Sequence, residues 1–246
     1  MERDTSPDGT GGGSRPPGGA RPSWRRERLA LGRGFKCVAG IDEAGRGALA
    51  GPVVAAAVVL DSKRCPKGIK DSKMLTAPAR ERLYEEITKS AISWGAGIAN
   101  AAEIDACNVL EATRRAMKRA VDAMAVKPDY LIVDAVALPG PGIAFEHPVR
   151  ADRHVISVAA ASIVAKVTRD RLMIGLDEEY AGYGFAVHKG YGTKEHFRAL
   201  SSRGPCALHR RTFAMIACGS LFSYDEMQAL AAPRPRRSAG PRGEAR

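Results

Sequence analysis

Short apolar runs, several of them rich in valine, alternate along the chain with longer segments that have helical periodicity. A glycine-dense stretch separates the first two runs, so their simplest arrangement is an antiparallel hairpin. Strands that alternate with long helices indicate a layered α/β domain. The patterns predict strands over residues 37–41, 53–60, 92–99, 130–133 and 143–149, and helices over 76–90, 100–127 and 156–176.

The two ends of the chain differ in composition from the body. Residues 1–34 hold eight Gly, four Pro and seven Arg against four acids, and residues 233–246 hold five Arg, three Pro and one Glu. Neither end has an apolar period, so we expect disordered tails around a body at 35–232. Most of the net charge of +11 lies in these tails. Such tails attract nucleic-acid phosphates, although they can equally serve only solubility.

Two classes of protein are excluded on composition. The longest nearly uncharged run, 48–60, is shorter than the roughly 18 residues that a membrane span needs, and no secretory leader opens the chain. We therefore expect a cytoplasmic protein with no membrane partner. Five cysteines lie far apart without a Cys-x-x-Cys pair, which argues against a disulfide framework and against a zinc site.

Carboxylates stand directly after several predicted strands. Asp42 and Glu43 follow the first strand, Asp134 follows Val133, and Asp152 comes just before the last long helix. If these strands lie side by side, the acids meet at one edge of the sheet, where ligands of open α/β sheets usually bind. Clustered carboxylates repel one another, and Mg²⁺ or Mn²⁺ would relieve that repulsion. Alternatively, each acid only begins a loop or caps a helix.

The segment between the first two strands, 42–52, contains three glycines and a proline. Glycine allows a left-handed backbone and close approach of a ligand, and Arg46 stands between Gly45 and Gly47 beside the acids. A strand follows this turn, and its glycine spacing differs from the dinucleotide-binding pattern. The segment is therefore either a functional loop or an ordinary turn.

Five segments closely resemble, in the same order, the motifs of the prokaryotic type 2 ribonucleases H, the ribonuclease HII family. The resemblance spans about residues 36–220. It implies an RNase H-like fold, in which helices flank a mixed central sheet and a small helical part, about 193–232, ends the body. The segments are VAGIDEAGRGALAGPVVAAAVVL (38–60), DSKMLT (71–76), LIVDA (131–135), ADRHVISVAAASIVAKVTRDR (151–171) and HKGYGTKEH (188–196).

The resemblance also implies an activity. Members of the family are hydrolases that cleave the RNA strand of RNA–DNA hybrids and cut on the 5′ side of a single ribonucleotide in duplex DNA, leaving 3′-hydroxyl and 5′-phosphate ends. Its partners would thus be nucleic acids, and we expect a monomer. Four acids hold two divalent ions, Mn²⁺ or Mg²⁺, in such enzymes. By motif, these acids are Asp42, Glu43, Asp134 and Asp152.

Matched motifs imply substrate-binding roles as well. Gly45, Arg46 and Gly47 correspond to the loop that reads the 2′-hydroxyl, and Tyr191 to the tyrosine that stacks at the RNA–DNA junction. Further donors in these motifs are candidates for phosphate contacts, or plain surface residues: Lys73, Lys189, Thr193 and Lys194. The alternatives are a type 3 ribonuclease H or transposase-like nuclease, and a non-catalytic protein that binds nucleic acid through its tails.

Overall fold

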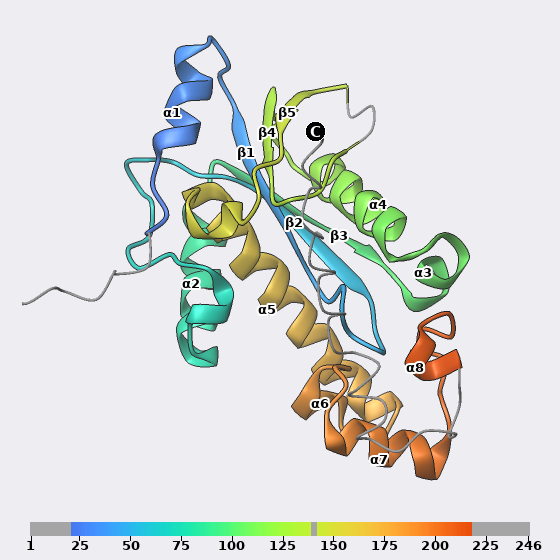
Figure 1. Ribbon diagram of the computed structural model, residues 1–246. Helices are drawn as coiled ribbons and strands as arrows, with labels where there is room; N and C mark the ends of the chain where they lie inside the picture. The colour runs from blue at the N-terminus through green and yellow to red at the C-terminus, as the bar shows by residue number, and fades with distance from the viewer. Residues whose placement is uncertain (1–20, 139–141, 218–246) are drawn as a thin grey trace, which may run out of the picture.

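The computed structural model describes residues 21–138 and 142–217 of the chain. Five strands form one mixed sheet in the order β3-β2-β1-β4-β5 (Figure 1). Antiparallel pairing joins β1 to β2 and β2 to β3, whereas β4 lies parallel to β1 and β5 parallel to β4. The predicted α/β class and the predicted hairpin are confirmed. The strands are β1 (Val38–Ala44), β2 (Val53–Val59), β3 (Ser93–Ala99), β4 (Tyr130–Val133) and β5 (Ala144–Glu146).

Helices cover both faces of the sheet. Figure 1 shows α3 and α4 on one face and α5 and α2 on the other. The elements are α1 (Arg25–Gly32), η1 (Ser72–Met74), α2 (Ala77–Ser90), α3 (Ala101–Cys107), α4 (Val109–Asp122), η2 (Ala151–Arg153), α5 (Ile156–Glu179), α6 (Phe185–His188), α7 (Lys194–Arg203) and α8 (Ala214–Ala217).

The inner strand β2 is apolar along its whole length because both of its faces are covered. Val53 and Ala55 belong to the core cluster shared with α4, while Ala56 and Val58 belong to the cluster shared with α5. Side chains that alternate between two buried faces give a continuous apolar run in the sequence. The sheet therefore sits in the middle of the core.

Helix α5 rests directly on the backbone of β1. A Cβ atom at Gly40 would lie only 2.2 Å from the carbonyl carbon of Ser157 in the first turn of α5. Any side chain larger than hydrogen at this position would push the helix away from the strand. The contact fixes the start of α5 beside the end of β1.

Two predicted elements differ in the structure. The single helix predicted over 100–127 is wrong, because α3 ends and α4 begins at Asn108, whose φ is 72°. The Asn108 side chain accepts hydrogen bonds from the Leu110 and Glu111 N–H groups, so it caps the second helix in a conformation that asparagine tolerates. The strand predicted over 143–149 is limited to β5, Ala144–Glu146.

The N-terminal tail is also shorter than predicted. Residues 25–32 form α1, although they were expected to be disordered. The reason is a tertiary contact: the buried Glu27 carboxylate accepts hydrogen bonds from Ser157 N–H and Oγ–H at 2.9 and 2.7 Å. The rest of both predicted tails, residues 1–20 and 233–246, lies outside the described residues.

The predicted helical C-terminal part contains α7 and α8 within the described residues. Phe197 of α7 and Ile216 of α8 pack with Leu49 of the loop between β1 and β2. This part of the chain therefore rests on the loop that the sequence singled out. Residues 218–232 of the predicted part are outside the described residues. No helix in the described segments is long and apolar enough to cross a membrane.

Candidate metal centre and nucleic-acid interface

Three of the four predicted acids converge at one edge of the sheet. In the parallel pair β1 and β4, Ile41 lies opposite Val133, so the next residues, Asp42 and Asp134, leave neighbouring strands at the same level. Asp152 comes from η2, at the entrance to α5. One carboxylate oxygen from each of the three lies within 4.8 Å of the other two. The prediction that these three acids lie together is confirmed, but strand ends do not place all of them: Asp42 lies within β1, and η2 carries Asp152 after β5 has ended at Glu146.

The backbone around the trio is held in unusual conformations. Asp134 Oδ1 accepts a hydrogen bond of 2.6 Å from Ala151 N–H, which ties the end of β4 to η2. Two nearby residues without the freedom of glycine adopt left-handed conformations, Ala135 with φ 50° and Arg150 with φ 57°. Such conformations cost about 1–3 kcal/mol each and persist only where the surroundings impose them.

Electrostatics opposes full ionisation of this cluster. Burial raises the pKa of Asp42 well above its usual value, and the charges of Glu43, Asp134 and Asp152 raise it further. Burial also raises the pKa of Asp134 and of Asp152, and the negative charge of a neighbouring acid raises each pKa further. Positive charge placed among the carboxylates would remove this penalty. A bound divalent cation would supply that charge.

Glu43 stands beside the trio and outside it. Its Oε1 accepts a hydrogen bond of 2.9 Å from Arg46, whereas its Oε2 is buried without a hydrogen-bond partner among the described residues. Burial raises the pKa of Glu43, and the hydrogen bond from Arg46 opposes that rise. An unpaired buried oxygen next to three carboxylates completes a set of oxygen donors. This set fits Mg²⁺ or Mn²⁺ better than zinc, which favours nitrogen and sulfur.

Two buried arginines hold the loop between β1 and β2 from the protein interior. Arg210 donates to the carbonyl oxygens of Gly45, Arg46 and Gly51 at 2.7–3.1 Å. Arg169 donates to the carbonyl oxygens of Ala50 and Pro52 at 3.1 and 2.8 Å. Both guanidinium groups are fully buried, and no carboxylate in the described residues forms an ion pair with either. Backbone carbonyl groups therefore replace acids as their partners.

This arrangement sets the direction of the loop's N–H groups. The C=O and N–H of one trans peptide point in opposite directions. Because the carbonyls of Gly45 and Arg46 point at Arg210, the N–H groups of Arg46 and Gly47 point the other way, and both residues are exposed. Successive N–H groups that point in one direction bind anions and other oxygen acceptors. The loop thus presents a binding surface next to the acids.

Gly45 and Gly47 of this loop are glycines for different structural reasons. Gly45 has a φ of 96°, and a Cβ there would lie 2.0 Å from Arg169 Nε, so no other residue fits. Gly47 has no left-handed φ, and a Cβ there would meet nothing within 4 Å. The missing side chain at Gly47 therefore leaves open space in front of the loop, where a ligand can approach the backbone.

Tyr191 lies on a second loop that packs against the first. The Gly190 carbonyl accepts hydrogen bonds from the Leu49 and Ala50 N–H groups at 2.8 and 3.2 Å. The half-buried ring of Tyr191 faces two cations, with Lys166 Nζ at 5.5 Å and Arg169 Cζ at 5.2 Å from its centroid. Arg169 therefore contacts both loops, which links the tyrosine to the glycine loop.

A chain of neutral histidines holds the Tyr191 loop. His196 Nδ1–H donates to the Tyr191 carbonyl at 2.9 Å, so its Nε2 is an acceptor. His209 Nε2–H donates to that nitrogen at 3.0 Å, and His209 Nδ1 accepts from Cys206 N–H at 2.9 Å. Burial lowers the pKa of His196 and of His209 to about 4. Protonation of either ring would break one of these hydrogen bonds.

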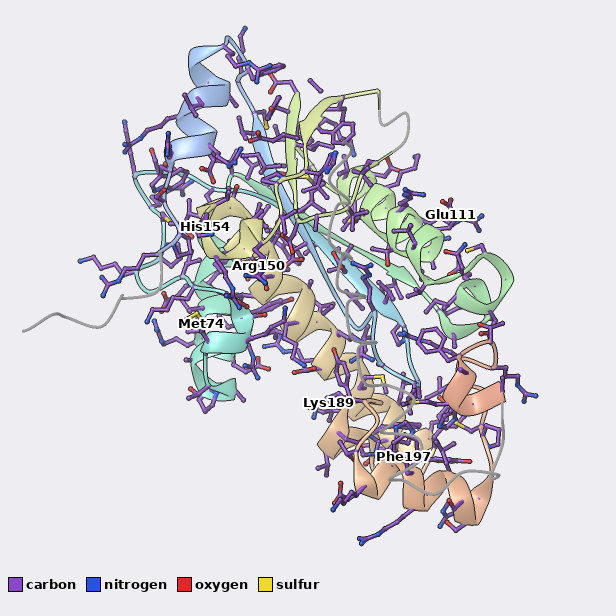
Figure 2. All side chains as sticks on the ribbon, viewed as in Figure 1. Met74, Glu111, Arg150, His154, Lys189 and Phe197 are labelled. Carbon is purple, nitrogen blue, oxygen red and sulfur yellow. The ribbon has the colours of Figure 1, made fainter. Side chains whose placement is uncertain are left out.

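The four predicted phosphate-binding candidates lie in different surroundings. Exposed Lys73 is close enough to the acids to lower the pKa of Asp134 and Asp152. Lys189 Nζ donates to the Ala186 carbonyl, and Thr193 Oγ1 caps α7 by accepting from His196 N–H at 3.3 Å. Lys194 is exposed at the start of α7. Figure 2 labels Lys189 at the C-terminal end of α5, away from Arg150 near the acids.

Sequence reasoning missed three residues of this region. Arg169 and Arg210 are buried under the loop, and buried Asp71 raises the pKa of Asp134 and Asp152. Arg169 offered one signal, since it lies in the apolar, alanine-rich stretch that became α5. Arg210 lies in a polar segment and gave no comparable signal.

Known proteins are similar to the chain over the stretch that contains this site. A family model described as Ribonuclease HII matches residues 39–216. A ribonuclease HII of Geobacter metallireducens is 50% identical over 195 residues, which cover 79% of this chain and 92% of the relative. One from Nitrosococcus oceani is 52% identical over 177 residues, 72% and 88% of the two chains. The crystal structure of the ribonuclease H2 from Pyrococcus horikoshii superposes with a TM-score of 0.63 at 28% identity, and the match covers 74% of this chain and 96% of that one. The chain therefore belongs to the ribonuclease HII family.

Proposed function

We propose that the chain cleaves the RNA strand of RNA–DNA hybrids and incises duplex DNA on the 5′ side of a single embedded ribonucleotide, leaving 3′-hydroxyl and 5′-phosphate ends. Membership of the ribonuclease HII family supports a metal-dependent hydrolase. The observation that carries the proposal is the trio of carboxylates within 4.8 Å of one another, beside a loop whose N–H groups face outward.

In this proposal Asp42, Glu43, Asp134 and Asp152 hold divalent ions, Mg²⁺ or Mn²⁺. When bound, two such ions would activate a water molecule and stabilise the departing 3′ oxygen. Asp42 has a ligand oxygen within 4.8 Å of Asp134 and Asp152, and positive charge there would favour its ionised form. Glu43 would contribute the oxygen that has no hydrogen-bond partner, while Arg46 holds its other oxygen.

Substrate recognition follows from the two loops. The Arg46 and Gly47 N–H groups are oriented to bind the oxygen of a ribose 2′-hydroxyl, which is the group that separates RNA from DNA. Tyr191 offers a flat ring for stacking on a sugar or base. Lys73 is the best placed of the candidate phosphate contacts because its charge already acts on the acids. Lys189, Thr193 and Lys194 remain predicted contacts.

The proposal also covers assembly and location. One chain supplies all the acids, so a second copy is not needed to complete the site, and we propose a monomer. We also propose that the enzyme acts in the cytoplasm, because the curated relatives are bacterial proteins and bacterial DNA lies in that compartment. Neither statement depends on the tails.

Replacing Asp42 or Asp134 with Asn tests the metal site directly. Each variant loses a negative ligand, so we expect cleavage of a single-ribonucleotide duplex to fall more than tenfold in Mg²⁺ or Mn²⁺, with duplex binding retained. Asp122→Asn on α4 is the matched control, since Asp122 is exposed and pairs only with Lys118. Both site variants keeping more than a tenth of wild-type activity contradicts the proposal.

The choice of substrate separates this function from that of other nucleases of the same fold. A type 3 ribonuclease H would cut a long hybrid and leave a lone ribonucleotide in DNA intact. The 50% identity to ribonuclease HII proteins favours incision at the lone ribonucleotide. Parallel assays on the two substrates, with chelator as the metal-free control, decide between them.

A further inference from the structure

The helix α1 lies outside the span that matches the family model, which begins at residue 39. It is nevertheless docked firmly at the junction of η2 and α5, next to Asp152. Ser23 N–H donates to the His154 carbonyl at 3.0 Å, and Ile156 N–H donates to the Ser23 carbonyl at 3.3 Å. Glu27 is buried against Ser157. The helix is therefore a fixed extension of the metal-bearing part of the fold.

The docked helix leaves a basic hollow between itself and η2, here called the α1 hollow. Its volume is about 370 Å³, and nine residues line it, among them Arg21, Arg25, Arg26, Ala151 and His154. No acid is among the lining residues. Asp152 lies between Ala151 and His154 in the chain, and its side chain joins the acids. Hence the hollow and the metal centre lie on either side of one short turn.

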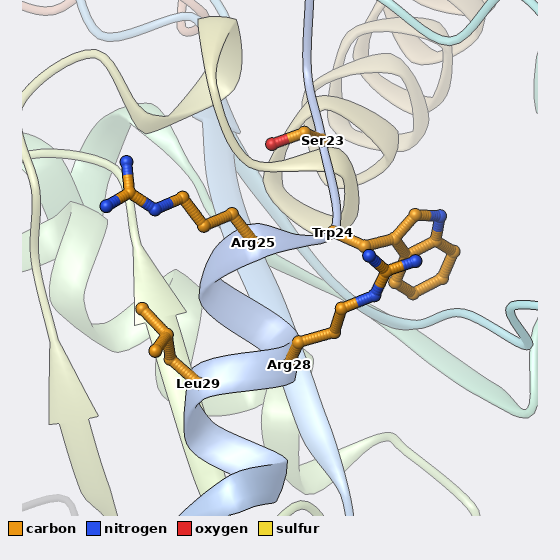
Figure 3. Close-up of a pocket in the computed structure, with 5 residues that line it drawn as sticks. All are labelled: Ser23, Trp24, Arg25, Arg28 and Leu29. Carbon is orange, nitrogen blue, oxygen red and sulfur yellow. The ribbon is translucent and has the colours of Figure 1, made fainter.

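The arginines at the hollow are available to an anion. Arg26 pairs with Glu146 at 2.8 Å, but exposed Arg21 and Arg25 have no carboxylate within 4.0 Å among residues 21–138 and 142–217. Arg25 also lines a second hollow of about 530 Å³ with Arg28 and Trp24. Figure 3 shows Arg25 and Arg28 leaving α1 on different sides, with Arg28 beside the Trp24 ring. The basic surface thus continues along the helix.

We propose that the α1 hollow binds the phosphate backbone of the duplex that flanks the scissile site, through Arg21 and Arg25. This inference rests on the proposed function, which places duplex nucleic acid across the metal centre. Three residues of chain between Asp152 and Val155 span at most about 11 Å. At 3.4 Å of rise per nucleotide, about 11 Å corresponds to about three base steps, so a phosphate at the hollow lies a few base steps from the cut. The glycine and Tyr191 loops lie toward the other end of α5, so the helix extends the contact surface in the opposite direction (Figure 1).

The test is the salt dependence of duplex binding by Arg21→Gln/Arg25→Gln. Glutamine keeps helix propensity and removes both charges, while the Glu27 and Arg26 anchors stay. Binding is measured without divalent metal, on a DNA duplex with one ribonucleotide and about 15 base pairs on each side. Each lost phosphate contact should weaken binding about 5- to 10-fold at 0.1 M salt and reduce the salt slope by about 0.9.

Two controls make the result specific. Arg115→Gln/Lys118→Gln removes the same charge from α4 on the opposite face of the sheet and should bind as wild type does. Arg21→Lys/Arg25→Lys restores the charges and should restore most of the slope. On duplexes trimmed to about two base pairs on one side or the other, the glutamine variant should lose its defect for one trimmed side only, because a phosphate beyond the end is missing.

Several outcomes overturn the inference. An equal loss in the α4 control shows a general charge effect, and an equal loss on both trimmed duplexes places the arginines elsewhere. Unchanged binding by a glutamine variant that melts at the wild-type temperature removes the hollow as a duplex site. A lower melting temperature with no rescue by lysine assigns the arginines to folding. Since binding is measured without cleavage, failure of the wild type to incise refutes the proposed function separately.

Discussion

Replacing Arg210 with Met tests whether the buried cation positions the glycine loop. Methionine fills similar space but has no donor. The Arg46 and Gly51 carbonyls would lose their hydrogen bonds from Arg210, while the Gly45 carbonyl keeps one from Ala48 N–H at 3.2 Å. The substitution thus frees the peptides that direct the N–H groups outward.

The expected effect on stability is small because two effects oppose each other. Leaving the buried Gly51 carbonyl without a partner costs about 1–3 kcal/mol, and the partly buried Arg46 carbonyl adds a smaller cost, or about 2–4 kcal/mol together. Burial, and after it the charge of Arg169, lowers the pKa of Arg210 from 12.5 to about 9. That shift corresponds to a cost of about 5 kcal/mol for keeping the buried arginine charged, and replacement by methionine removes this cost. We therefore expect the free energy of unfolding to stay within about 3 kcal/mol of the wild type.

The expected effect on activity is large by comparison. A misplacement of about 1 Å at a reacting site can cost about 100-fold, so kcat/KM on the single-ribonucleotide duplex should fall by that order. Arg210→Lys, which keeps a cation under the loop, should recover part of the loss. Arg171→Met is the control, because exposed Arg171 pairs with Glu81 and Glu85, lies over the Tyr84 ring and forms no hydrogen bond or ion pair with the glycine loop among the described residues. A folded Arg210→Met variant that stays within tenfold of wild-type kcat/KM would refute the positioning role.

Three further predictions follow from the same region. Gly45→Ala should lower the free energy of unfolding by about 1–3 kcal/mol or more. Gly47→Ala should change that free energy by less than about 0.5 kcal/mol and still reduce kcat/KM. Denaturant unfolding measures the first quantity, and steady-state kinetics measures the second. NMR titration of His196 and His209 should give midpoints near their pKa of about 4. In the unfolded chain these rings take up protons from about pH 6.5, so as pH falls to about 4 each ring lowers the free energy of unfolding by up to about 3 kcal/mol. Midpoints above about 6 would contradict this. Adding Mg²⁺ at ten times its Kd should stabilise the fold by about 1.4 kcal/mol in thermal melts, and the same gain in Asp134→Asn would argue against the site.

The position of two acids of the trio could be predicted because it follows from neighbouring strands. Apolar runs mark β1 and β4, and Asp42 and Asp134 come at positions that parallel pairing brings to one level. The parallel pairing itself could not be read from the residues, because short apolar strands carry no sign of their partner. The same strand-end pattern also included Glu43, whereas Tyr191 was singled out only through resemblance to the family. Their proposed roles stay predictions.

The features that sequence missed depend on contacts between distant segments. Helix α1 has a weak apolar face and many arginines, and it is held by Glu27 reaching Ser157, 130 residues away. The break at Asn108 depends on a left-handed residue that asparagine allows but does not require. Arg210 reaches the Gly45 carbonyl over 165 residues. Local periodicity contains none of this information.

Gly40 has no side chain, yet its contact with α5 sets the spacing of the proposed metal ligands. Asp42 is two residues beyond Gly40 on β1, and Asp152 is five residues before Ser157, the point where α5 touches that glycine. A methyl group there would act as a spacer between strand and helix and move the two carboxylates apart without altering either. Mutational surveys limited to polar residues would overlook this position, and attempts to transplant the acids onto another scaffold would need to reproduce the same close approach.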